Sequence, residues 1–168
     1  RDGRFLTYTV REGLSNDNVR ALLRARDGSV WIGTAGGGLN RLKDGHVTTL
    51  REKDGLPSDH VSSLFEDRRG TLWVGTNLAG AARLSNGRFA ALGPAQGLPH
   101  HDVRAFAEDG DGNVWIGTIG GGLTRVAPDG SLRVYTTGRD GLPSDRILAI
   151  AVGPDGSIWL GSPALGVV

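Results

Sequence analysis

Hydrophobic and polar residues alternate in short runs along this chain, and turns rich in Gly, Asp and Asn separate the runs. Alternation with a period of two over four to eight residues predicts a half-buried β-strand. Asn86-Gly87, between two such runs, is typical of a tight hairpin turn. One stretch of the chain therefore predicts a four-stranded antiparallel unit, with strands at residues 61–66, 71–76, 81–84 and 88–92.

This unit recurs four times. Four Trp residues are spaced 42, 42 and 44 residues apart, each in a phrase such as Val30-Trp31-Ile32-Gly33-Thr34. A Gly-Leu-Pro phrase recurs with the same period, as at residues 55–57. Two independent phrases in register indicate a genuine internal repeat. The Trp residues are Trp31, Trp73, Trp115 and Trp159, and the repeats cover residues 13–54, 55–96, 97–140 and 141–168 together with 1–12.

Four-stranded units of this length with Gly and Trp signatures predict a β-propeller. A barrel or a sandwich would not require an identical four-strand unit. We therefore predict an all-β fold: one propeller or half-propeller domain over residues 1–168, with four blades of four antiparallel strands. Residues 4–9 align with the fourth strands, whereas residues 165–168 align with a third strand. The N-terminal strand is expected to complete the last blade, closing a ring within one chain or between two.

Composition narrows the function classes. The 28 Gly residues fit many tight turns, and the absence of Cys excludes disulfides and thiol chemistry. Nineteen basic and eighteen acidic residues leave a net charge of +1 without long runs of one sign, so no nucleic-acid or membrane-surface binding is expected. The chain does not begin with Met, which we interpret as a processed, excised or tag-cleaved protein.

The residues at 55–61, 66–67, 72–76 and 120–123 resemble the blade of the two-component regulator propeller family. The resemblance implies a sensory propeller, periplasmic or extracellular, that senses carbohydrate-like ligands or mediates association. Propellers of that family have seven or more blades, whereas this chain has four. We therefore expect either an excised or engineered piece, or a homodimer that forms an eight-bladed ring.

Strand order places the Gly-Leu-Pro loops at the mouth of the central channel. Carboxylate, imidazole and guanidinium groups there could hold a small polar or carbohydrate ligand. Alternatively, these short polar side chains bond only the backbone of their own loops. The equivalent positions are Asp17, Asp59, His101 and Asp145, followed in each repeat by Asn18, His60, Asp102 and Arg146. The four Trp residues, flanked by aliphatic residues, are expected to pack between blades.

No catalytic set stands out from the repeat. His60 or His101 could act as a base, as in a related propeller lyase family, but no Glu occupies the Gly-Leu-Pro segments of these loops, residues 13–18, 55–60, 97–102 and 141–146. Residues 109–113 begin like a calcium loop and then lack its required Gly and Glu. We predict no cofactor, no metal and no enzymatic activity. The chain is interpreted as a binding or sensory module, with a self-assembling structural fragment as the alternative and a propeller lyase as a distant third.

Overall fold

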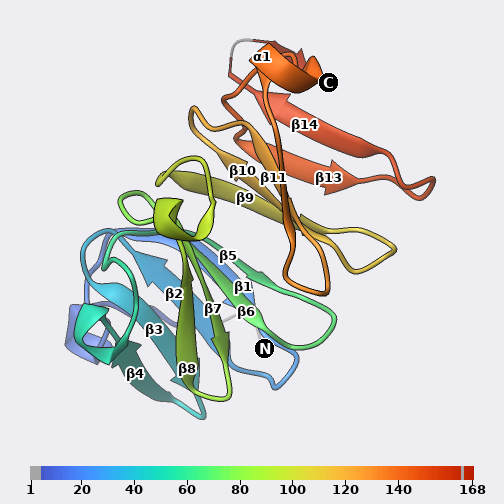
Figure 1. Ribbon diagram of the computed structural model, residues 1–168. Helices are drawn as coiled ribbons and strands as arrows, with labels where there is room; N and C mark the ends of the chain where they lie inside the picture. Colours follow the sequence, from blue (N-terminus) through green and yellow to red (C-terminus); the bar gives the residue numbers. More distant parts are fainter. Residues whose placement is uncertain (1–4, 164) are drawn as a thin grey trace.

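The computed structural model describes residues 5–163 and 165–168, and four antiparallel sheets make up most of it (Figure 1). Each sheet is one blade, so the prediction of an all-β propeller fold with four blades is confirmed. Blade 1 consists of β1 (Val19–Arg24), β2 (Val30–Thr34), β3 (Gly38–Lys43) and β4 (His46–Leu50). Blade 2 consists of β5 (Val61–Glu66), β6 (Leu72–Thr76), β7 (Ala81–Ser85) and β8 (Arg88–Leu92). Blade 3 consists of β9 (Val103–Glu108), β10 (Val114–Thr118), β11 (Leu123–Val126) and β12 (Leu132–Tyr135). Blade 4 has three strands, β13 (Ala149–Val152), β14 (Ile158–Ser162) and β15 (Gly166–Val167).

Two outer hairpins have the turn chemistry that their sequences predict. Asp44 and Asn86 both adopt φ of +50°, and the glycines that follow them, Gly45 and Gly87, adopt +79° and +74°. Positive φ at both central residues defines the type I′ turn, whose twist matches that of the flanking strands. Asp and Asn tolerate this backbone better than other residues with a side chain, which explains why they precede the glycine here.

The Gly-Leu-Pro loops contain short helical turns that the alternation pattern does not reveal. Each is three or four residues long and ends at a glycine with positive φ, such as Gly55 at +96°. Such short turns bury no hydrophobic face, so they leave no periodic signal in the sequence. They are η1 (Val10–Glu12), η2 (Glu52–Asp54), η3 (Pro94–Gln96) and α1 (Thr137–Asp140).

The hydrophobic core lies in layers between consecutive blades. The first strands β1, β5, β9 and β13 follow one another side by side in chain order, so each blade contacts the next (Figure 1). Trp73 of blade 2 is 3% exposed, and its ring centroid lies 6.2 Å from that of Phe106 in blade 3. Trp31 and Trp115 belong to the corresponding clusters of the other two junctions.

Trp159 is the exception among the four Trp residues. Its side chain is 53% exposed, because in the structure no blade lies beyond blade 4 on that side. The prediction that all four Trp residues pack between blades is therefore wrong for Trp159 within this chain. The same residue type in the same phrase is buried only where a following blade covers it.

In the described part of the chain, blade 4 also lacks the fourth strand that we predicted for it. Residues 5–9 form no strand, and residues 1–4 lie outside the described part of the chain. Blade 1 and blade 4 lie at opposite ends of an open arc, and residues 5–9 do not pair with β15 (Figure 1). Among the described residues the ring is therefore open, and closure between two chains stays a prediction.

Candidate ligand-binding face

Three aspartates of the predicted channel mouth hold their own loops in place. The Oδ1 atom of Asp17 accepts a hydrogen bond from the Val10 amide at 2.8 Å, and that of Asp59 accepts one from the Glu52 amide at 2.9 Å. Asp145 accepts from both the amide and the hydroxyl of Thr137, each at 2.8 Å. These carboxylates therefore cap the helical turns of their loops, the alternative role that the sequence left open.

His101 occupies the same position in blade 3 and makes no such bond. The residue at the first position of its loop's helical turn is Pro94, which has no amide hydrogen to donate. The loop therefore needs no acceptor at position 101. The His101 ring instead stacks on His100, with 4.3 Å between ring centroids, and it is exposed.

The next position in each repeat carries a different side chain in every blade. Asn18 accepts from Arg20 at 3.1 Å, and Asp102 forms an ion pair with Arg104 at 2.7 Å. His60 and Arg146 are exposed, and within the described residues their side chains have no hydrogen-bonding or ionic partner.

Main-chain bonds fix these loops to the preceding blade. The carbonyl of Asp59 accepts from the amides of Gly36 and Gly38 in blade 1, at 3.0 and 2.9 Å. The carbonyl of Asp145 accepts from Gly120 and Gly122 of blade 3, both at 2.9 Å. We call the surface formed by the Gly-Leu-Pro loops the loop face. Hydrogen bonds hold its backbone in place, and its exposed side chains project from fixed positions.

The pKa of His100, in the third loop, is lowered. Partial burial lowers its pKa below the usual 6.5, the neighbouring His101 lowers it further, and Asp102 opposes both effects. Its Nδ1 atom accepts from the Asp102 amide at 3.1 Å. The neutral imidazole is therefore favoured at His100 at neutral pH. In this form its Nδ1 atom can accept the hydrogen bond from the backbone of its own loop.

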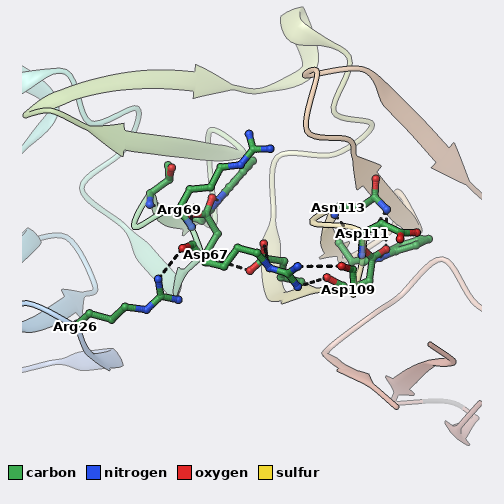
Figure 2. Close-up of polar contacts among 12 residues, drawn as sticks. Arg26, Asp67, Arg69, Asp109, Asp111 and Asn113 are labelled. Atoms are coloured by element: carbon green, nitrogen blue, oxygen red, sulfur yellow. Dashed lines mark hydrogen bonds and ion pairs between the residues drawn. The ribbon is translucent and has the colours of Figure 1, made fainter. Parts of the chain in front are cut away.

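The opposite face carries polar contacts between blades that sequence reasoning missed. Arg26 reaches the carbonyl of Arg68 at 2.8 Å, and Arg68 in turn pairs with Glu108 at 2.9 Å, so the hairpins of blades 1 to 3 are linked (Figure 2). Within blades 2 and 3, Asp67 and Asp109 each accept from the indole N–H of the Trp six residues later, at 2.9 and 2.8 Å (Figure 2). The spacing of six residues between this Asp and the Trp recurs in blades 2 and 3, and this recurrence is the sequence signal from which the contact could have been predicted.

Blade 1 lacks this aspartate, because Ala25 stands six residues before Trp31. A cavity of about 400 Å³ opens beside Trp31 and Ala25, between the hairpins of blades 1 and 2. None of the eight loop-face positions lines it.

Among residues 5–163 and 165–168, no three or more His, Asp or Glu side chains come together in a way that could hold a metal ion. In the same part of the chain, no helix has the length and apolar character needed to cross a membrane.

Comparison with known proteins identifies the repeat. The sequence matches the family described as two component regulator propeller four times, at residues 13–36, 55–78, 97–120 and 141–164. A search of curated proteins finds no match.

Solved structures share the fold. The extracellular domain of a one component system from B. thetaiotaomicron is 26% identical with a TM-score of 0.75, covering 96% of this chain and 22% of that one. The extracellular domain of a hybrid two component system from the same organism is 24% identical with a TM-score of 0.50, covering 90% of this chain and 26% of that one. Virginiamycin B lyase from Staphylococcus aureus is 20% identical with a TM-score of 0.66, covering 90% of this chain and 54% of that one. The chain thus spans about a quarter of the two extracellular domains and about half of the lyase.

Proposed function

The chain belongs to the two-component regulator propeller family, and from this we propose that it is a non-enzymatic binding module of a sensory propeller, situated in the periplasm or outside the cell. Its similarity to extracellular domains of bacterial signalling systems supports that location. The ligand we propose is a small polar molecule rich in oxygen acceptors, either a saccharide or a carboxylate.

One observation carries this proposal: the loop face combines a fixed backbone with exposed donors that differ from blade to blade. Asp59 and Asp145 hold their loops, and the side chains that follow, His60 and Arg146, are free of protein partners within the described residues. Binding sites are commonly built from variable side chains on a rigid scaffold. Imidazole and guanidinium groups both donate hydrogen bonds to oxygen, and Arg binds carboxylates through two parallel bonds.

Catalysis is not part of the proposal. A general base at His60 or His101 would need a partner that orients its ring and stabilises its charge. Among the described residues, no carboxylate is hydrogen-bonded to either ring, and Asp102 is already paired with Arg104. These imidazoles are therefore suited to binding rather than to proton transfer.

Calorimetry with defined probes tests the proposal. Neutral oligosaccharides, uronate-containing oligosaccharides and small dicarboxylates would be titrated into the whole chain. We expect saturable binding of at least one class, weakened at least tenfold in the double variant His60→Ala, Arg146→Ala. The control is His46→Ala, an exposed imidazole beside the Asp44-Gly45 hairpin on the opposite face, which should bind normally. Binding that the double variant leaves unchanged would contradict the site, and no binding of any class would contradict the proposed ligand chemistry.

A further inference from the structure

The three junctions between blades share one steric feature. At each, a glycine of the second strand faces a β-branched side chain that lies at the start of the next blade's first strand or, at the third junction, two residues before it. A Cβ atom added to Gly33 would lie 2.5 Å from Val61, and one added to Gly75 would lie 2.8 Å from Val103. At the third junction, a Cβ on Gly117 would lie 2.7 Å from Ile147. The three β-branched residues, Val61, Val103 and Ile147, are at most 1% exposed.

At the two ends of the arc, the glycine and the β-branched side chain that would face each other lie on different blades without a partner blade between them. Gly161 of blade 4 is the equivalent glycine, and among the described residues the atoms nearest to a Cβ there belong to Ala149 of its own blade, at 3.1 Å. Val19 of blade 1 is the equivalent β-branched residue and is 39% exposed, with Leu22 beside it 67% exposed. Blade 4 therefore offers a recess without a side chain to fill it, and blade 1 offers the side chain.

The fourth strands and the loop glycines that they cover are separated in the same way at the two ends of the arc. In blade 2 the loop glycine Gly55 lies beneath Phe89 of the fourth strand, since an added Cβ would be 3.7 Å from that side chain. For the equivalent glycine of blade 4, Gly141, an added Cβ would have no atom of the described residues within 4 Å. Phe5 is fully exposed and precedes its loop glycine, Gly13, by eight residues, the same interval that separates Phe89 from Gly97. Phe5 thus has the sequence position of a fourth-strand residue and lacks the blade that it would cover.

The polar contacts on the hairpin side do not oppose a junction between these two ends. At the first two junctions, the amides of Arg26 and Arg68 donate to a glutamate of the next blade. In blade 4 the residue five before the Trp is Pro154, which has no amide hydrogen, and blade 1 carries Arg24 where the glutamate would stand. At a junction between blade 4 and blade 1, this amide donor and this carboxylate are both absent. Neither group would therefore be buried without a partner.

We propose that blade 4 of one chain docks on blade 1 of a second copy, in the manner of the three internal junctions. Val19 of the second copy fills the recess at Gly161, Trp159 becomes buried, and the second copy's residues 5–9 pair with β15 as the fourth strand of blade 4. The contact is heterologous, so it either closes into a ring or continues into longer assemblies. Two copies that close on each other make eight blades. The proposal does not depend on the ligand proposed above.

Light scattering after size exclusion tests the docking. The chain should have twice its 17.6 kDa mass, and Val19→Asp, at an exposed site that leaves the fold intact, should have the single mass. Gly161→Val should also give the single mass, because its side chain occupies the recess. The matched control is Gly110→Val, where an added Cβ meets nothing within 4 Å, and it should keep the double mass. A single mass for the unaltered chain, or a double mass for Val19→Asp, would overturn the proposal.

A mixture of the two variants separates this docking from other self-association. Val19→Asp retains the blade 4 face and Gly161→Val retains the blade 1 face, so an equimolar mixture should form a dimer joined by one intact junction. Two monomers that fail to combine would overturn the head-to-tail arrangement, and assemblies of the unaltered chain larger than two would overturn closure by two copies. Ligand titrations on the monomeric Val19→Asp chain report on the proposed function independently.

Discussion

Trp73→Ala removes the side chain that fills the junction between blades 2 and 3. Trp73 is 3% exposed, and its indole N–H donates to the carboxylate of Asp67, itself only 6% exposed. Truncating a buried Trp costs about 3–5 kcal/mol, through lost apolar contact and the cavity left behind. The variant also removes one hydrogen-bond donor from the buried Asp67 carboxylate, which further lowers the free energy of unfolding. We therefore expect a cost of about 4 kcal/mol in the free energy of unfolding.

Trp159→Ala is the matched control, because the same residue occupies the same phrase in blade 4. Trp159 is 53% exposed, and its indole N–H donates to the hydroxyl of the half-buried Ser157. It thus has about half as much apolar surface to lose on truncation, which scales the expected cost to about 2 kcal/mol. The comparison isolates the contribution of the neighbouring blade.

Urea titrations followed by far-ultraviolet circular dichroism would measure both variants. They would be made in the Val19→Asp background, so that a second copy does not cover Trp159. The slope of free energy against urea should stay constant, so that midpoints report stability. Equal losses for the two variants, or a loss of less than about 1 kcal/mol for Trp73→Ala, would refute the assignment of stability to the blade junctions.

Two further predictions follow from the same structure. Gly75→Ala should cost about 1–3 kcal/mol in urea titrations, because its Cβ would clash with the Ser63 hydroxyl and lie 2.8 Å from Val103, whereas Gly110→Ala should stay within about 0.5 kcal/mol. Burial raises the pKa of Asp109, but hydrogen bonds from Asn113 and Trp115 lower it more, so it lies below its usual 3.8. The unfolded chain therefore binds the proton more readily, and this stabilisation is present above about pH 4 and lost as the pH falls further. Asp109→Asn should flatten the dependence of the urea midpoint on pH below 4, and an unchanged dependence would contradict this role.

The strands and turns of each blade could be predicted from the residues alone. Alternation placed the strands of blade 2 within a residue of their observed bounds, because side chains in a strand point alternately to a buried and an exposed face. Asn86-Gly87 specified its turn, since few other residue pairs accept positive φ at both positions. The recurrence of the Trp phrase then gave the number of blades.

The role of each copy of a repeated residue depends on the tertiary structure. Asp59 and His101 occupy equivalent positions, yet only Asp59 is committed to its loop, because Pro94 leaves His101 without an amide to accept from. Trp73 and Trp159 share one phrase and differ in exposure from 3% to 53%, because burial depends on whether another blade lies against the strand. Local sequence sets the conformation of a strand through its own backbone and side chains. Which of its faces is covered depends on segments forty or more residues away, and only the folded arrangement of the blades determines that.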